Sequence, residues 1–138
     1  MITNDRQLAA TKLKIESLKE SIKKISEEAK IKPLLKASKI QSLSLVKELQ
    51  NEIFVYEELK TRGLDAIEIN DLTEIMLIPI KYRIAKRMTQ EMFAKEVEIP
   101  LRMIARYESE SYRNITGENL YKILQKLHLK IPGKLQEA

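Results

Sequence analysis

The sequence predicts an all-α protein, with a long N-terminal helical hairpin or coiled coil followed by a compact bundle of four to five short helices. Three observations lead to this class. Apolar residues in the first half recur every three or four positions, as they do on one face of a helix. Capping residues and prolines divide the second half into short helical segments. Strand-like alternation is confined to residues 66–69, and the 138 residues suffice for one or two small domains.

A first long helix is predicted over residues 5–30. Thr3 or Asn4 is expected to cap it, because a short polar side chain can accept a hydrogen bond from an otherwise unpaired backbone N–H. The mostly apolar a and d positions of three heptads follow at Leu8, Thr11, Ile15, Leu18, Ile22, Ile25 and Ala29. Such a narrow stripe needs one partner helix, either in the same chain or in another subunit.

A second helix is predicted from about Leu34 to Arg62, after a break at Lys32-Pro33. Its apolar stripe consists of Val46, Leu49, Ile53 and Tyr56, widened by Leu45, Phe54 and Leu59. Gly63 stands where a left-handed C-terminal cap is expected. Residues 1–63 are therefore predicted to form an antiparallel helical hairpin or a dimerising coiled coil, which serves dimerisation or partner binding.

The second half begins after a connector over residues 64–70 that is expected to be extended. Asn70 is predicted to cap a short helix through Ile78, and Pro79 to lie in the first turn of the next helix. Three further short helices are predicted, capped or opened by Thr89 (residues 90–97), Pro100 (residues 101–107) and Thr116 (residues 118–127). The spacing of these signals predicts a compact bundle.

Composition excludes several classes of function. The absence of Cys excludes disulfides and thiolate chemistry and fits a cytoplasmic protein, and a lone His128 cannot supply a His-based metal site. The longest apolar stretch, residues 75–80, is far shorter than the roughly 20 residues of a membrane span, and the N-terminus lacks the order of a signal peptide. We therefore predict no enzyme, no cofactor, no metal and no membrane association.

The formal net charge of +5 is unevenly distributed along the chain. Residues 1–76 hold 13 basic and 13 acidic side chains, whereas residues 77–138 hold 12 basic and 7 acidic side chains. The whole excess therefore lies in the second half. Such an asymmetry indicates a module for a polyanion joined to a neutral one, although ordinary surface variation could also produce it.

Spaced residues in this basic half carry a recognisable motif. They are Arg83, Met88-Thr89-Gln90 and Phe93-Ala94, followed by Val97, Ile99, Ile104 and Arg106-Tyr107-Glu108. The motif resembles the Cro/CI-type (XRE) helix-turn-helix of transcription regulators, and residues 114–123 resemble the helix that follows it in that family. The resemblance spans about 50 residues and identifies residues 70–131 as an expected DNA-binding domain.

The resemblance implies where DNA is bound. Thr89 and Gln90 would meet a phosphate at a helix N-terminus, and the helix from Leu101 would lie in the major groove. Leu101, Arg102 and Met103 would face base edges, and Arg106 a base or a phosphate, with Arg102 best able to read guanine. Arg83 and Arg113 complete the expected DNA-binding set. Three further residues would support the motif from inside: Ala94 must be small where the helices cross, and Ile99 and Ile104 fill the core.

The chain departs from the family at three positions. Arg87 and Glu98 stand at turn positions where the family usually has Gly, and a positive φ there would cost on the order of 1 kcal/mol. Glu98 also places negative charge near the expected DNA face, and Pro100 replaces the usual Ser. Glu108 is expected to hold the bundle together through a hydrogen bond or an ion pair.

The two halves together predict a homodimeric, sequence-specific repressor that binds operator DNA and whose N-terminal half controls dimerisation. The chain starts with a helical segment, continues through residues 49–59 of the second helix and ends in this helix-turn-helix. This overall architecture is similar to HigA-type antitoxins, which would add a co-encoded toxin as a partner. A protein–protein adaptor with a degenerate helix-turn-helix is the alternative from another class. Glu98, Pro100 and the missing turn glycines favour the adaptor, whereas the localised positive charge opposes it.

Overall fold

The computed structural model describes residues 1–29 and 35–138, which form six α-helices, two 3₁₀ helices and connecting segments, with no strand. The predicted all-α class is confirmed. The chain forms two compact units, Met1–Ala66 and Ile67–Ala138. The predicted break at Lys32-Pro33 and helix start at Leu34 lie outside the described residues. No helix in the described ranges is long and apolar enough to span a membrane.

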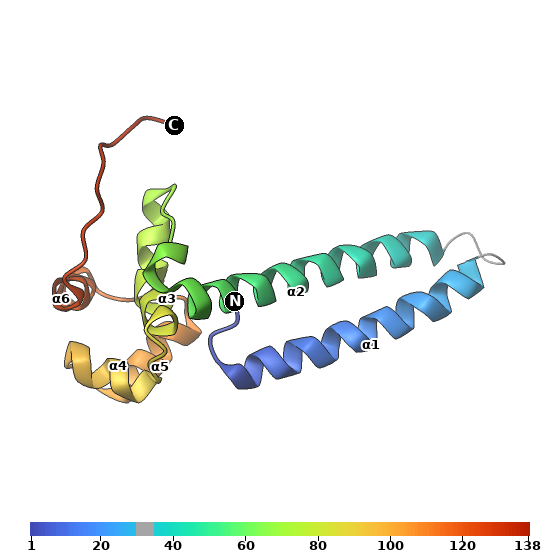
Figure 1. Ribbon diagram of the computed structural model, residues 1–138, viewed down its shortest axis with the longest axis horizontal. Helices are drawn as coiled ribbons and strands as arrows, with labels where there is room; N and C mark the ends of the chain where they lie inside the picture. Colours follow the sequence, from blue (N-terminus) through green and yellow to red (C-terminus); the bar gives the residue numbers. More distant parts are fainter. Residues whose placement is uncertain (30–34) are drawn as a thin grey trace. The chain divides into compact units, whose positions relative to one another are not determined.

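The first unit is a helical hairpin made within one chain. Helices α1 (Asp5–Ala29) and α2 (Lys36–Arg62) lie side by side and run in opposite directions (Figure 1). Ile15 from the predicted heptad stripe of α1 and Val46, Tyr56 and Leu59 from α2 are buried. The sequence left open whether the stripe of α1 packs against a helix of the same chain or of another subunit. The structure shows that it packs against α2 of the same chain.

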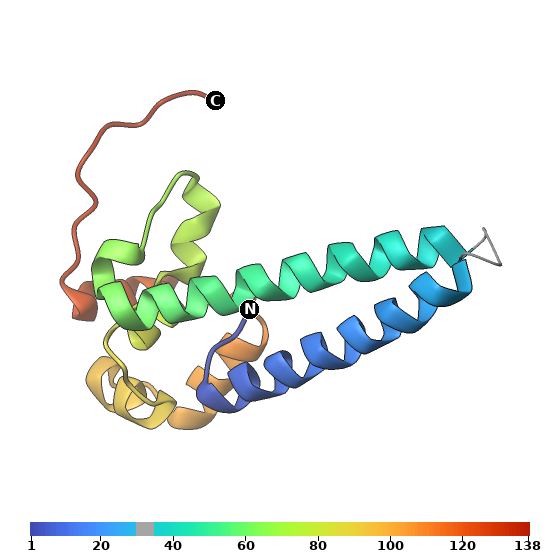
Figure 2. The same cartoon turned by 45° about the vertical axis from the view of Figure 1, so that its right-hand side comes forward.

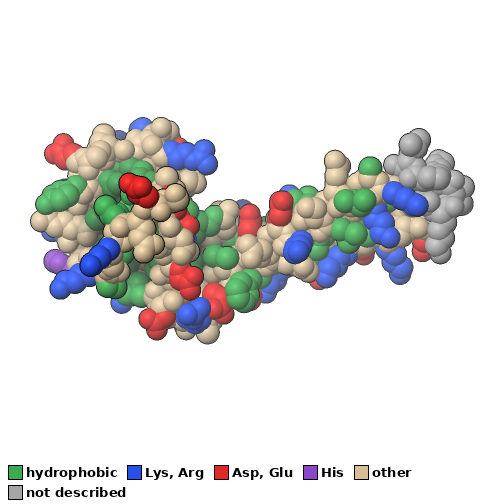
Figure 3. Space-filling view, turned by 90° about the horizontal axis from the view of Figure 1, so that it is seen from above, with side chains coloured by type: hydrophobic (Ala, Val, Ile, Leu, Met, Phe, Trp, Pro, Cys, Tyr) green, Lys and Arg blue, Asp and Glu red, His purple; other side chains and the backbone are tan. Residues whose placement is uncertain are grey.

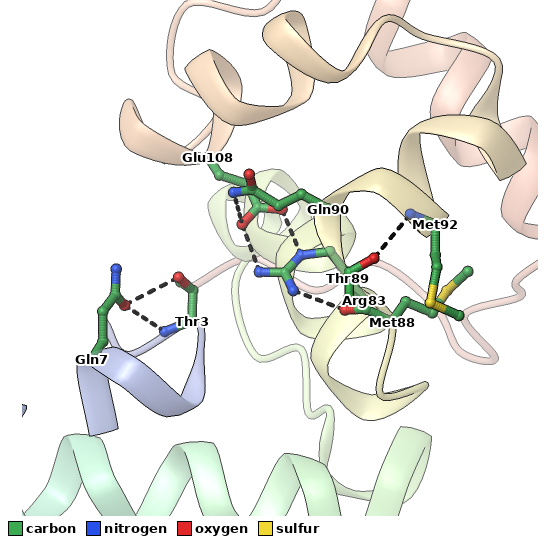
Figure 4. Close-up of polar contacts among 8 residues, drawn as sticks. All are labelled: Thr3, Gln7, Arg83, Met88, Thr89, Gln90, Met92 and Glu108. Carbon is green, nitrogen blue, oxygen red and sulfur yellow. Dashed lines mark hydrogen bonds and ion pairs between the residues drawn. The ribbon is translucent and has the colours of Figure 1, made fainter. Parts of the chain in front are cut away.

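Polar contacts fix the open end of the hairpin. Asn4 caps α1 by accepting a hydrogen bond from the Gln7 backbone N–H at 2.8 Å, while Gln7 accepts one from the Thr3 backbone N–H at 2.8 Å (Figure 4). Asp5 accepts hydrogen bonds from the Lys60 ammonium at 2.8 Å and the Tyr56 hydroxyl at 2.9 Å. These two donors hold the pKa of the Asp5 carboxyl below its usual range.

Two sequence predictions for α2 need correction. Phe54 does not widen the packed stripe, because 61% of it is exposed. Gly63 does have the expected positive φ of 65°, and its N–H donates to the Leu59 carbonyl, but its ψ of −138° lies outside the left-handed helical region. Because of its exposure, Phe54 belongs to the outer surface of the hairpin, and Gly63 ends α2 without a left-handed helical cap.

The connector between the units is more helical than predicted. Residues 63–66 form the 3₁₀ helix η2 (Gly63–Ala66) in place of an extended segment. The cap of the next element, the 3₁₀ helix η3 (Leu72–Leu77), is Asp71 and not Asn70, because the Asp71 carboxylate accepts from the Thr73 N–H at 2.7 Å. Both residues are good caps, and only the backbone geometry decides between them.

The second unit contains η3 and four short α-helices, whose ribbons are seen in Figure 2, and these helices share one small core. They are α3 (Ile78–Ala85), α4 (Gln90–Val97), α5 (Leu101–Ser109) and α6 (Gly117–Leu127). Pro79 lies in the first turn of α3, and Thr89 and Thr116 cap α4 and α6 through their side chains, as predicted. The most deeply buried side chains of this core include Ile80, Phe93, Val97, Ile104, Tyr112 and Ile123.

Candidate nucleic-acid interface

Helices α4 and α5 are joined by a tight turn over residues 98–100. Glu98 adopts the left-handed conformation, with φ 57° and ψ 42°, and the Ile99 N–H donates to the Ala94 carbonyl at 3.1 Å. Ala94 is buried, as expected for the small residue at the point where the two helices approach each other. Ile99 and Ile104 are also buried, so the predicted core of the motif is confirmed.

The N-terminus of α4 presents hydrogen-bond donors. The Thr89 hydroxyl accepts from the Met92 N–H at 3.1 Å, and the Thr89 carbonyl accepts from the Phe93 N–H at 3.0 Å. The N–H groups of Gln90 and Glu91 precede the first intrahelical bonds, so they remain available as donors. Together with the positive end of the helix dipole, they suit an anion.

Helix α5 divides into a buried face and an exposed face. Ile104, Tyr107 and Glu108 point into the unit, and the Tyr107 hydroxyl accepts from the Asn119 amide at 2.8 Å. The exposed residues Leu101, Arg102 and Arg106 and the half-buried Met103 are the four residues of this helix that the sequence assigned to DNA contact. The structure therefore places all four on one short helix, with Arg102 at its second position.

A buried ion pair lies behind this surface. The Arg83 guanidinium binds both carboxylate oxygens of Glu108, each at 2.7 Å, and donates to the Met88 carbonyl at 3.0 Å (Figure 4). The Gln90 amide also donates to Glu108, at 3.2 Å. The expectation that Glu108 holds the bundle together is confirmed. The same carboxylate joins α3, the start of α4 and α5.

Arg83 is placed differently from the other expected DNA-binding residues. Only 5% of it is exposed, because its guanidinium faces Glu108 inside the unit, and we therefore assign it a structural role. Gln90 is half-buried with its side-chain amide turned to the same carboxylate. Arg113 is exposed in the segment between α5 and α6. Sequence position alone could not separate the buried arginine from the exposed ones.

The backbone carries the strain anticipated at the two turn positions. Arg87 has φ 54° and Glu98 has φ 57°, so both non-glycine residues adopt the conformation that favours glycine. Ser111 and Tyr112, with φ 54° and 57°, form a second left-handed turn after α5 that the sequence did not reveal. Neither residue type signals such a turn, which is why it was missed.

Two lysines of α6 surround Glu98 and were also missed. Lys126 forms an ion pair with the Glu98 carboxylate at 3.1 Å, and Lys122 donates to the Glu98 carbonyl at 3.5 Å. The spacing of four residues places both lysines on one side of α6. The negative charge near the expected DNA face is therefore opposed by a positive charge from the same unit.

Tyr112 fills the centre of the unit. Its ring lies 5.6 Å from that of Tyr107, and its hydroxyl has no hydrogen-bond partner among the described residues. Burial raises the pKa of this hydroxyl, and the nearby Glu108 carboxylate raises it further. The neutral phenol is thus the form that the folded unit accommodates.

Part of the second unit matches a known protein family. Residues 80–133 match the family described as Helix-turn-helix, which covers α4, the turn and α5 together with most of α3 and all of α6. Comparisons with curated proteins and with solved structures find no match. The family match indicates a DNA-binding transcription regulator and favours this class over the adaptor.

Proposed function

We propose that the protein is a sequence-specific repressor of transcription that binds double-stranded operator DNA as a homodimer. The observation that carries the proposal is the α4–turn–α5 unit, with a capped, donor-rich α4 N-terminus beside an α5 that exposes two arginines. In this arrangement α5 lies in the major groove, and Thr89 with the first N–H groups of α4 meets a phosphate.

The base contacts come from the exposed side of α5. Arg102 stands free of any ion pair among the described residues, so its guanidinium fork is available for the N7 and O6 acceptors of guanine. Leu101 and Met103 supply apolar contacts, for example to a thymine methyl group. Arg106 shares its charge with Glu110 at 3.5 Å, and we assign it, with Arg113, to phosphate contact.

A homodimer follows from the small size of this surface. One helix covers only a few base pairs, and regulators of this kind gain specificity by placing two recognition helices about 34 Å apart on a palindromic site.

The role of an antitoxin is the narrower form of the same proposal. It adds one requirement, namely that a small toxin encoded beside the protein binds it and co-purifies with it.

The proposal is tested by gel-shift titration of the full chain against the DNA upstream of its own gene at two salt concentrations. The affinity should fall steeply with salt, because each neutralised phosphate releases counterions. Arg102→Ala should relax the preference for the cognate site by roughly 1–3 kcal/mol. Lys95→Ala, which removes another exposed charge, from α4, should leave the preference unchanged. Equal preference in all three proteins would refute the groove assignment.

A further inference from the structure

The outer face of α2 carries a second heptad stripe that the hairpin does not use. Its members follow a strict alternation of four and three residues, and all are exposed: Lys36, Ile40, Leu43, Lys47, Gln50 and Phe54. None of their side chains has a hydrogen bond or an ion pair among the described residues. The apolar members are substantially exposed, at 67% for Ile40, 48% for Leu43 and 61% for Phe54. Figure 3 shows hydrophobic side chains among charged ones on the hairpin surface.

We infer that this stripe pairs with the same stripe of a second copy of the chain, and that the two α2 helices run antiparallel. The inference rests on the proposed function only in supplying the interface for its homodimer. The seam between α1 and α2 is already filled within one chain, so it cannot also hold two chains together. The second stripe is the part of α2 that remains for a partner.

The spacing sets the register. In an antiparallel pair of heptad stripes an a position meets a d position of the other helix. Placing Leu43 against Phe54 of the second copy brings Lys47 against Gln50 and Ile40 against the stem of Glu57. Both apolar ends of the stripe are then covered, and the polar pair lies at the two-fold axis. Such an interface is isologous, as most homodimer interfaces are.

The charges select the antiparallel direction. Between Lys36 and Lys47 the helix has only basic charged side chains, whereas residues 48–62 hold four glutamates against Lys60 and Arg62, a net charge of −2. Antiparallel pairing places the basic half of one helix beside the half of the other that has a net negative charge. Parallel pairing would place Lys36 on Lys36 and Lys47 on Lys47 of the second copy, and like charges at such contacts oppose association.

The first experiment measures the mass of the full chain in solution without DNA, by sedimentation over a range of concentrations. A dimer is expected, and Leu43→Asp should weaken it about a hundredfold, because each substitution removes two buried side chains from a symmetric interface. Leu13→Asp is the matched control, since Leu13 is an exposed leucine on α1 outside the stripe. It should leave the mass unchanged. A monomer at all concentrations, or equal effects of both variants, would overturn the inference.

The second experiment tests the direction, and it uses the fact that the chain contains no cysteine. Leu43 and Phe54 lie about 16 Å apart along one helix, so they cannot form a disulfide within a chain. Leu43→Cys with Phe54→Cys should form a disulfide-linked dimer on oxidation, whereas Leu43→Cys alone should not. Efficient cross-linking of the single variant would indicate parallel pairing and refute the register. Because neither readout involves DNA, a failure here is separate from a failure of operator binding.

Discussion

The buried pair of Arg83 and Glu108 gives the sharpest test of how the second unit is held together. Replacing Arg83 by Met keeps most of the side-chain volume but leaves the Glu108 carboxylate inside the unit without its two bonds of 2.7 Å. The side chains are only 6% and 3% exposed, so water cannot replace the lost partner. Removing one partner of a buried pair typically costs about 3–5 kcal/mol.

That cost is large compared with the stability available. The second unit spans residues 67–138, and domains of this size have a free energy of unfolding of roughly 4–11 kcal/mol. For a domain of this length each kcal/mol corresponds to about 4–8 °C in Tm, so Arg83→Met should lower the Tm by at least about 12 °C. Circular dichroism during thermal and urea unfolding measures the loss.

Two controls decide whether the burial of the pair is the cause. Arg106→Met breaks a pair of 3.5 Å in which Arg106 is 68% exposed, and it should change the free energy of unfolding by less than about 0.5 kcal/mol. Replacing both Arg83 and Glu108 by Met and Leu should recover much of the loss, because no buried charge then remains unpaired. A loss below about 1 kcal/mol for Arg83→Met would refute the reasoning.

Three further predictions concern single positions of the same unit. Glu98→Gly should raise the free energy of unfolding by about 1 kcal/mol, because glycine adopts the positive φ without strain. It should also tighten DNA binding in gel shifts, because it removes the carboxylate that pairs with Lys126. Thr89→Ala should lower the free energy of unfolding by about 1 kcal/mol through loss of the α4 cap, as measured by urea titration. Tyr112→Phe should leave stability unchanged or higher at neutral pH, because the buried hydroxyl has no partner among the described residues. The raised pKa of Tyr112 means that the unfolded chain loses this proton first, so stability should fall as the pH rises above about 10 in the parent protein and less so in the variant.

Much of this fold was predictable, because the relevant signals are local in the sequence. The heptad stripe of α1, the caps at Thr89 and Thr116 and the small Ala94 each follow from a rule that acts within a few residues. The structural role of Glu108 was also predicted, and its bonds from Arg83 and Gln90 confirm that role. Local signals therefore predicted the helices and the turn between α4 and α5.

The errors arose where a long-range contact decides between two locally equal readings. Phe54 directly follows Ile53 of the inner stripe and also continues the spacing of the outer stripe, and only its exposure in the folded hairpin shows that it belongs to the outer one. Arg83 and Arg102 are the same residue type in the same basic half, yet one faces a buried carboxylate and the other is exposed. The left-handed turn at Ser111 and Tyr112 is stabilised in part by burial of the Tyr112 ring, which no local pattern records.

The positions of the charged side chains determine how much of the net charge of +5 is available to contact DNA phosphates. Arg83 is withdrawn into the core, Arg106 is shared with Glu110, and Lys126 is shared with Glu98. Each phosphate neutralised contributes about −0.9 to the slope of log K against log salt. The phosphate contacts proposed for one unit use two cations, Arg106 and Arg113, so a single unit should have a shallow slope and weak binding. Two units held on one operator add their contacts, and the outer stripe of α2 would supply that connection. If the protein binds DNA tightly with Leu43→Asp in place, the affinity must come from a larger contact surface than α4 and α5 provide.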